Sequence, residues 1–262
     1  MHIVNEAAWE IPIYFAVTVS QQNRIGLDSY LDMEGLTFHL KSHKTTGIDK
    51  EKMFQNLMTD IGPPEWSIDF DHKSFYSSLS EENSSSLSWS KNYQPGYMFR
   101  NLGNKKVYFN KQTNRLLQNY RSAYVQLAFT YYLDYMRESG KKKAGSKELT
   151  LELKRRIVSI LNKMSRNIPE ETIPIQSGDL HHQIARIYGD LDEKELMREI
   201  METLINQENS RPLKRVDYAN SFYRDLGDEG VAIDVLEEMR SKYLKVEGMI
   251  KTRGFSSKTV SS

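Results

Sequence analysis

Two pairs of histidines are the residues of this sequence that most readily suggest metal chemistry. His181 and His182 are adjacent, and His39 and His43 lie four residues apart. Neighbouring side chains on a helix point about 100° apart, so the adjacent pair cannot hold one metal ion without help. The chain has no cysteine and no further histidine at helical spacing from this pair. We therefore expect surface or helix-start roles for the histidines and no metal site.

The acidic cluster at Asp190–Glu195 could supply a pair of catalytic carboxylates. It lies where a predicted turn leads into a helix, and the helix dipole favours acids at a helix N-terminus. A similar acidic group, Asp225–Glu229, follows at the next predicted turn, which favours a structural role for both. The sequence also contains no glycine-rich phosphate loop, serine-hydrolase motif or zinc-protease motif. We expect no catalytic residue, no cofactor and no enzyme activity in this chain.

The distribution of charge is uneven, although the net charge is only +1 over 262 residues. Residues 141–166 hold nine Lys and Arg against two Glu, whereas residues 170–240 are strongly acidic. The basic segment could contact phosphate in lipid headgroups or nucleic acid. It lacks interleaved aromatic residues and any nucleic-acid-binding motif, so we expect a solvated helix face and no nucleic-acid partner. The longest apolar run, Ile11–Val19, is too short to span a bilayer, and the chain has no recognisable export signal.

Residues 1–110 have the composition of a small α/β layer. A serine-rich stretch at 62–96 can bury little apolar surface and is predicted to be a mobile insertion. Asp49 is a suitable N-cap for the helix that follows it. The elements expected here are strands at Pro12–Val19, Leu36–Leu40 and Tyr97–Asn101, a short helix or loop at Leu27–Met33, and a helix at Ile48–Met58.

The longest helical pattern is Gln112–Glu138, where apolar residues recur every three or four positions from Leu116 to Tyr135. Its core motif, Leu127-Ala128-x-x-Tyr131, is repeated further along the chain, and each copy precedes a second amphipathic helix. The later copies are Ile184-Ala185-x-x-Tyr188 and Ala219-Asn220-x-x-Tyr223. Residues 111–250 are therefore predicted to form helical hairpins, and residues 251–262 a disordered tail.

The interval from Tyr188 to Tyr223 resembles that of the tetratricopeptide repeat, whose period is about 34 residues. Ala232 fits the small position that opens the second helix of such a repeat, and Met197 occupies it in the preceding hairpin. The predicted fold class is α+β, mainly α, with a small α/β N-terminal layer followed by tetratricopeptide-like hairpins. Ala232 and several neighbours on the last helix, including Leu236 and Tyr243, are expected to face the core.

Stacked hairpins curve, and the first helix of each pair lines the concave side. Polar residues of those helices that lie off the core stripe should then be exposed in one groove, which could receive a protein or peptide. Surface ion pairs with Asp190 and Asp225 are the alternative role for its arginines. The residues expected in this groove are Asn119, Arg121, Gln183, Arg186, Asn220 and Arg224.

Four stretches together resemble the C-terminal soluble region of a family of large polytopic membrane proteins. Those proteins are similar to GT-C-type protein O-mannosyltransferases, and many are bacterial. The resemblance covers most of residues 2–240, is specific in the first forty residues and around 99–121, and is loose in the repeats. The serine-rich segment at 62–96 resembles an insertion beyond the usual length of the family. The stretches that carry it are Trp9–Ser20, Asn23–Leu36, Phe99–Leu102 and Arg115–Arg121.

This resemblance implies that the catalytic, membrane-embedded half precedes the present chain. The chain would then be a non-catalytic, extracytoplasmic (periplasmic) C-terminal domain of an inner-membrane glycosyltransferase, itself soluble. It would act in protein interaction or acceptor positioning, and one partner could be the membrane half of the same polypeptide. A free-standing tetratricopeptide-like protein-binding module is the alternative.

Overall fold

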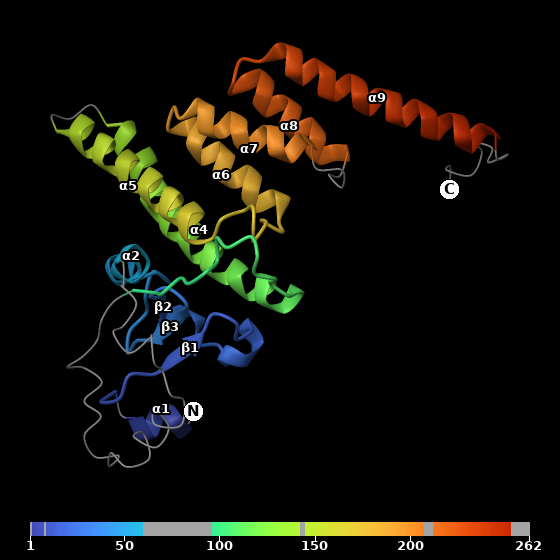
Figure 1. Cartoon of the computed structure of the whole chain (residues 1–262). Helices are drawn as coiled ribbons and strands as arrows, with labels where there is room; N and C mark the ends of the chain where they lie inside the picture. The colour runs from blue at the N-terminus through green and yellow to red at the C-terminus, as the bar shows by residue number, and fades with distance from the viewer. Residues whose placement is uncertain (1, 8, 60–95, 142–144, 207–211, 253–262) are drawn as a thin grey trace, which may run out of the picture. The chain divides into compact units, whose positions relative to one another are not determined.

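The computed structural model describes residues 2–7, 9–59, 96–141, 145–206 and 212–252 (Figure 1). The chain is mainly helical and has one small antiparallel sheet near the N-terminus, which confirms the predicted α+β, mainly α class. Packing divides it into two compact units, Met1–Pro174 and Ile175–Ser262.

The sheet has three strands in the order β1-β3-β2, and both pairings are antiparallel. β3 is central, so Phe38 lies opposite Phe15 on one side and Met33 on the other. Leu31, Met33 and Leu40 are buried and provide the apolar side of the sheet. The strands are β1 (Tyr14–Ala16), β2 (Leu31–Met33) and β3 (Thr37–Leu40).

We predicted a central strand at Pro12–Val19, whereas the strand in the structure is shorter and lies at the edge of the sheet. Only Tyr14–Ala16 is strand, and it is an edge whose residues are exposed or half-buried. Tyr14 stacks on His39 with ring centroids 4.5 Å apart instead of entering a core. The buried positions belong to β2, in the segment that we expected to be a short helix or loop, and a 3-10 turn at Asp28–Tyr30 precedes it.

The third predicted strand, at Tyr97–Asn101, is also wrong, because this described segment forms no strand of the sheet. Tyr97 instead joins two elements through its side chain. Its hydroxyl accepts a hydrogen bond of 2.9 Å from the backbone N–H of Leu36, and its ring meets Tyr120 edge-on at 5.6 Å. Tyr97 therefore links Leu36, just before β3, to Tyr120 through its side chain.

The remaining N-terminal elements are short. α2 matches its prediction: the Asp49 carboxylate caps it by accepting a bond of 3.1 Å from the Lys52 N–H, and Met53 and Leu57 are buried. The elements are α1 (His2–Ala7), 3-10 turns at Gln21–Arg24 and Asp28–Tyr30, and α2 (Lys50–Met58).

α4 (Lys111–Ser139) and α5 (Ser146–Asn167) form the long helical hairpin of the first unit. Asn110 caps α4 by accepting a bond of 2.8 Å from the Thr113 N–H. The predicted stripe of α4 is buried over its middle turns, whereas Leu116 at its start is 47% exposed. The buried apolar residues of α4 are Ala123, Tyr124, Val125, Leu127, Ala128 and Tyr131.

Arg121 lies inside this unit, with no exposed surface, and not in an open groove as we expected. Its guanidinium donates to the backbone oxygens of Ile168, at 2.9 Å, and Ile173, and to the side chain of Gln118 at 3.2 Å. Burial lowers the pKa of Arg121 to about 10, which still leaves it charged at neutral pH. Ile168 is the C-cap of α5, so this one side chain ties the end of α5 and the following loop to α4.

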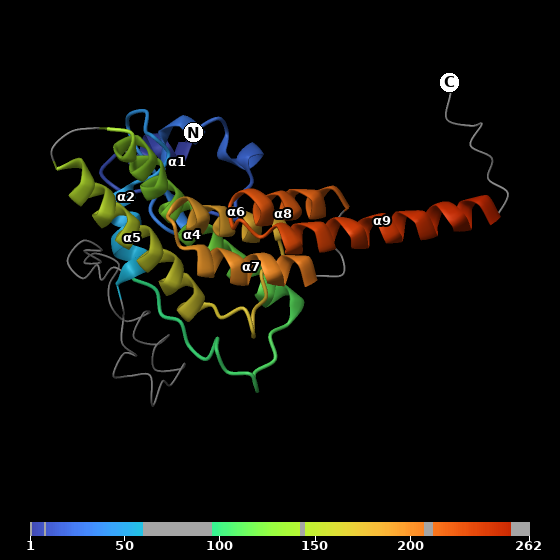
Figure 2. The same ribbon diagram turned by 90° about the horizontal axis from the view of Figure 1, so that it is seen from above.

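The second unit consists of two helical hairpins, α6 with α7 and α8 with α9, and α7 also packs on α8 (Figure 2). Ser177 caps α6 by accepting a bond of 3.3 Å from the Leu180 N–H. An ion pair of 2.6 Å between Arg198 and Asp228 joins α7 to the turn before α9. The helices are α6 (Gly178–Asp190), α7 (Lys194–Asn206), α8 (Pro212–Arg224) and α9 (Glu229–Thr252).

The repeated motif has a different register in α8 from the one predicted. Asn220 is exposed and Tyr223 is 58% exposed, whereas Tyr218, Ala219 and Phe222 are buried. The motif is therefore Tyr218-Ala219-x-x-Phe222, and Phe222 follows Tyr188 at the tetratricopeptide interval of about 34 residues. The prediction placed the aromatic residue of the third motif nine positions before Ala232, as Tyr188 precedes Met197. The turn before α9 is one residue longer than the turn before α7, so the buried aromatic residue is Phe222 and not Tyr223.

The expected core face of α9 is correct only in part. Ala232 and Val235 are buried against the hairpin, whereas Leu236 and Tyr243 are 45% and 71% exposed. α9 has 24 residues and α8 only 13, so α8 cannot cover the second half of α9.

The expected division near residue 110, between a small α/β region and a repeat domain, stays a prediction. By packing, α4 and α5 group with the N-terminal region, and the line falls at Pro174. The predicted insertion at 62–96 lies outside the described residues except for Gly96. Of the predicted tail at 251–262, the first two residues close α9 and the others are not described.

We predict that Arg121→Met lowers the free energy of unfolding by roughly 3 kcal/mol, because two buried carbonyl groups lose a charged donor. Chemical denaturation followed by circular dichroism measures the change. Arg115→Met, an exposed change on the same helix, is the control and should have an effect below about 0.5 kcal/mol. Equal stability of the two variants would contradict the role of Arg121.

Candidate functional site

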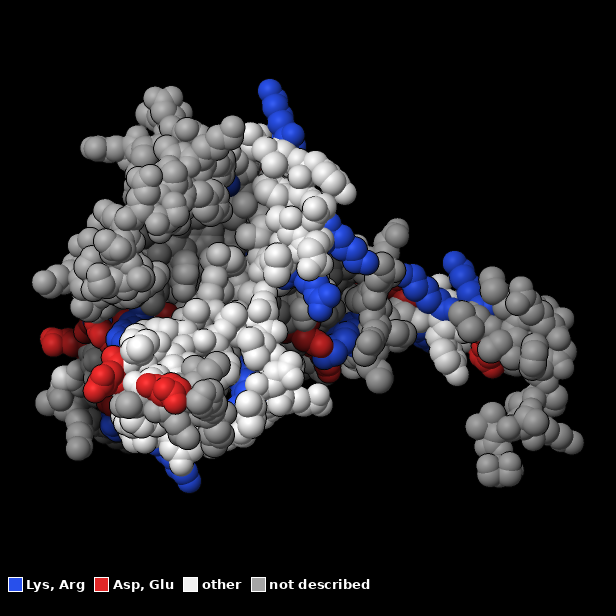
Figure 3. Space-filling view, turned by 90° about the horizontal axis from the view of Figure 1, so that it is seen from below, with Lys and Arg blue, Asp and Glu red and all other residues white. Residues whose placement is uncertain are grey.

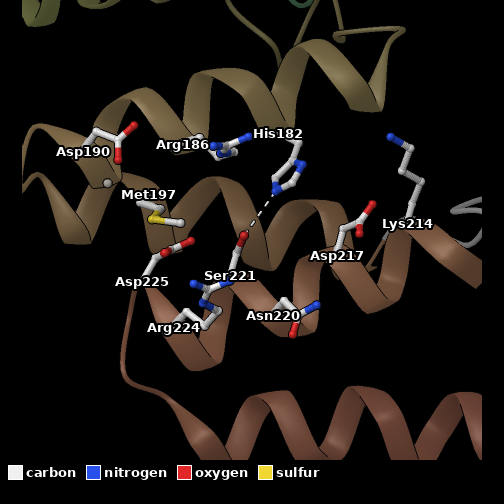
Figure 4. Close-up of a pocket in the computed structure, with 11 residues that line it drawn as sticks. His182, Arg186, Asp190, Met197, Lys214, Asp217, Asn220, Ser221, Arg224 and Asp225 are labelled. Carbon is white, nitrogen blue, oxygen red and sulfur yellow. Dashed lines mark hydrogen bonds between the residues drawn. The ribbon is translucent and has the colours of Figure 1, made fainter. Parts of the chain in front are cut away.

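A hollow of the second unit lies between α6 and α8 and has a volume of about 600 Å³ (Figure 4). α6 and α8 are the first helices of the two hairpins, as expected for a concave face. The polar character of the hollow comes from side chains spaced three and four residues apart on each helix. Its lining residues are His182, Arg186, Gly189, Asp190, Met197, Lys214, Asp217, Asn220, Ser221, Arg224 and Asp225.

Both arginines of the predicted groove line this hollow. Arg186 comes from α6 and Arg224 from α8, and both side chains are exposed. Asn220 also lines it and is exposed on α8. Arg186 and Arg224 thus lie in the same hollow (Figure 4) and neither is buried, while their role in binding a protein or peptide stays a prediction.

The other three predicted groove residues lie elsewhere. Gln183 is exposed on α6 but outside the lining of the hollow. Asn119 is half-buried on α4, in the first unit, and Arg121 is buried there. The prediction treated the first helix of every hairpin as equivalent, whereas α4 buries the position of Arg121 because the loop after α5 folds over it.

The hollow has three basic and three acidic side chains, so its formal charge is zero. The bases are Arg186, Lys214 and Arg224, and the acids are Asp190, Asp217 and Asp225. Lys214 also forms an ion pair of 2.6 Å with Asp179 at the first turn of α6, which raises the pKa of this lysine through the hydrogen bond and the charge of Asp179.

His182 connects the two helices of the hollow. Its Nε2 lies 3.2 Å from the hydroxyl oxygen of Ser221, and its ring meets Tyr218 edge-on at 5.1 Å. Burial lowers the pKa of His182, and the nearby Arg186 and Lys214 lower it further. The imidazole is therefore neutral at pH 7, and one ring nitrogen can accept the Ser221 proton while the other donates.

The paired histidines named above lie in different surroundings. His181, the neighbour of His182, is buried on α6, and His43 is exposed. The part of the chain that the structure describes contains no group of three or more His, Asp or Glu placed to hold a metal ion. His182 is instead a contact residue that sequence reasoning missed, although its spacing of four from Arg186 puts both on one helix face.

A second polar cluster lies in the first unit, around Glu34. The Oε1 atom of Glu34 accepts bonds from His39 at 2.7 Å, Lys41 at 3.1 Å and Lys52 at 3.0 Å. These bonds lower the pKa of Glu34 although burial opposes them, and the Glu34 backbone oxygen accepts a further bond from Asn56. The cluster joins β3 and α2 to the turn after β2, so its contacts account for a structural role.

Comparison with known proteins gives one match. Residues 1–58 match the family model described as TMEM260-associated domain 2, a span that contains the sheet, α2 and the Glu34 cluster. No curated protein matches the chain, and no solved structure does. Among the described residues, no helix is both long enough and apolar enough to cross a membrane.

We predict that the free energy of unfolding decreases as the pH falls, because His182 becomes protonated. Because folding lowers the pKa of this histidine from 6.5, its neutral form stabilises the folded state above about pH 6.5, and this contribution declines as the pH falls below that value. His182→Gln should flatten the decline of melting temperature between about pH 7 and pH 5. His43→Gln, an exposed change, should leave the decline unchanged, and identical pH profiles for wild type and His182→Gln would refute the prediction.

Proposed function

We propose that this chain is a non-catalytic domain of a GT-C-like glycosyltransferase membrane protein and acts outside the cytoplasm in protein interaction. The match at residues 1–58 to a TMEM260-associated domain supports this association. The four sequence stretches that resemble the soluble region of such proteins support it further, since the first two fall within that match. The proposal assigns sugar transfer to a membrane-embedded part and not to the residues present here.

The observation that carries the interaction role is the hollow between α6 and α8. Its volume of about 600 Å³ falls in the range of sites that enclose several ligand groups. Arg186 and Arg224 can pair with carboxylates, and the Asn220 amide can both donate to and accept from a peptide backbone. Acidic neighbours can meet basic side chains of the same ligand, so the site suits an extended, mixed-charge peptide segment.

The corrected repeat interval supports a tetratricopeptide-like use of these hairpins. The spacing between Tyr188 and Phe222 matches the period of that repeat, which is about 34 residues. The same packing places polar residues of α6 and α8 on one side. The ligand would be a loop of the membrane-embedded part or a segment of the acceptor protein. A free-standing tetratricopeptide-like protein-binding module is the alternative, and it uses the same hollow.

The double variant Arg186→Glu/Arg224→Glu tests the hollow. Peptides are first selected from a displayed random library for binding to the wild type. We expect the double variant to bind these peptides about 30-fold more weakly than the wild type binds them, because groove arginines contribute about 2 kcal/mol in such contacts. Calorimetry measures the affinity. Arg115→Glu/Arg155→Glu reverses two exposed arginines of α4 and α5 and is the matched control.

Unchanged melting temperatures of both double variants are required for this comparison. The hollow is not the binding site if the selected peptides bind the Arg186→Glu/Arg224→Glu variant as tightly as the wild type. The same variant separates the two proposals for the chain. If the wild type co-purifies with a separately expressed membrane-embedded segment and this variant does so more weakly, the glycosyltransferase-domain proposal is supported, whereas a wild type that binds the selected peptides but no such segment supports the free-standing module.

We also predict that the purified chain transfers no sugar. The sequence offers none of the recognised catalytic motifs, and the proposed donor site lies in the membrane part. Incubation with a lipid-linked mannose donor and acceptor peptides, followed by mass spectrometry, measures transfer. Product formation above the level of a buffer control would show that the chain itself is an enzyme.

A further inference from the structure

α9 has partly exposed apolar residues beside those that pack on α8, and two of them, Ile233 and Leu236, border a hollow of about 290 Å³ that α9 shares with α8. Ala232 and Val235 are buried, whereas Ile233, Leu236 and Leu244 are 46%, 45% and 52% exposed. The exposed residues recur at intervals of three and eight, so they lie on one face of the helix. Exposed apolar residues that continue past the packed part of a helix, as Leu244 does here, are typical of an interaction surface.

α9 is much longer than α8, so its second half lies beyond the helix on which its first half packs. A helix rises about 1.5 Å per residue, so α9 is roughly 36 Å long and α8 roughly 20 Å. Figures 1 and 2 show the second half of α9 continuing past the end of α8. Each residue from Arg240 to Lys245 is exposed. An exposed helical segment such as 240–245 gains little from tertiary packing and is marginal in water, so a partner would stabilise it.

The charges of α9 are segregated along its length. The first half is acidic, and the second half is basic except for Glu247. Figure 3 shows several Lys and Arg side chains, with an acidic one among them, on the part of α9 that extends past the hairpin. The acids of the first half are Glu229, Asp234, Glu237 and Glu238, and the bases of the second half are Arg240, Lys242, Lys245 and Lys251.

We propose that α9 pairs with α9 of a second copy of this chain, in antiparallel orientation, and forms a two-fold symmetric dimer. Antiparallel pairing puts the acidic half of each helix against the basic half of the other, whereas parallel pairing puts like charges together. A two-fold axis needs a self-complementary surface, and this helix supplies one in both charge and apolar residues. The proposal uses no residue of the α6–α8 hollow and stands independently of the proposed function.

The register follows from the residues of the exposed face. Placing Glu237 opposite Arg240 of the second copy centres the pair between residues 238 and 239, and symmetry then gives that ion pair twice. The same centre places Ile233 opposite Leu244 of the second copy, again twice. Glu237, Arg240 and Leu244 line one shallow surface hollow of about 490 Å³ on α9, and the facing helix fills that surface.

The interface is small, because one helix from each copy contributes most of it. It falls below the roughly 1,200 Å² that marks stable complexes, so the dimer should be weak and concentration-dependent, with a dissociation constant on the order of micromolar. Sedimentation equilibrium of the whole chain, over concentrations from about one-tenth to one hundred times that value, measures it.

Charge reversal at the paired positions tests the register. Glu237→Arg alone and Arg240→Glu alone each bring two like charges together, and each should weaken dimerisation at least tenfold. The double variant Glu237→Arg/Arg240→Glu restores opposite charges and should recover an affinity within about threefold of the wild type. Glu202→Arg, an exposed reversal on α7, is the control and should dimerise normally.

Each outcome decides the proposal. A wild-type chain that stays monomeric at every concentration overturns it, and dimerisation unaffected by either single reversal places the interface elsewhere and also overturns it. A double variant as weak as the single variants overturns the antiparallel register. Circular dichroism melting of all four variants verifies that they remain folded, and retained peptide binding in the single variants shows that a failure here leaves the proposed function untouched.

Discussion

The burial of one charged side chain, Arg121, is the constraint on which the first unit depends. A guanidinium without exposed surface must direct its donors at protein oxygens, and those of Ile168 and Ile173 satisfy it. This requirement fixes where α5 ends and how the loop after it returns over α4. Tyr124 extends the same network by donating to the Leu57 oxygen at 2.8 Å and accepting from Asn167 at 3.0 Å. The end of α2, the middle of α4 and the end of α5 are thus joined through buried polar contacts and not through apolar packing alone.

The second unit is organised by repetition. Ile184-Ala185-x-x-Tyr188 in α6 and Tyr218-Ala219-x-x-Phe222 in α8 bury an aliphatic or aromatic residue, an alanine and an aromatic ring at equal spacing. Because the buried positions of α6 and α8 are equivalent, the polar positions between them are equivalent too. These polar side chains line the hollow from both helices. The Arg198–Asp228 pair holds the second hairpin at its turn, and the His182–Ser221 contact joins the first helices.

Much of this fold could be predicted from the sequence, since long periodic helices such as α4 and α5 and the Asp49 cap have strong local signals. The failures have specific physical causes. β1 and the segment after Tyr97 are rich in aromatic residues that act through ring and hydroxyl contacts, which a strand pattern cannot distinguish from a ladder. The register of the third motif depended on one extra turn residue. Arg121 occupies a position on its helix like that of the exposed groove arginines. It is buried because the loop after α5, which is distant in sequence, folds over it. The exposure of Arg186 and Arg224 follows from helix periodicity alone, whereas their role in binding stays a prediction.

The balance of charge in the α6–α8 hollow has a kinetic consequence. Three basic and three acidic groups produce little field beyond contact distance, so a ligand is not drawn toward the site from solution. Encounter should then proceed at the ordinary rate of about 10⁵–10⁶ M⁻¹s⁻¹ and depend weakly on ionic strength. Segments that match the hollow and segments that do not would differ mainly in their dissociation rates. The reason is that the charges of the hollow act on a ligand only at close contact. Such a surface selects by residence time, which suits a segment already held nearby by the same polypeptide.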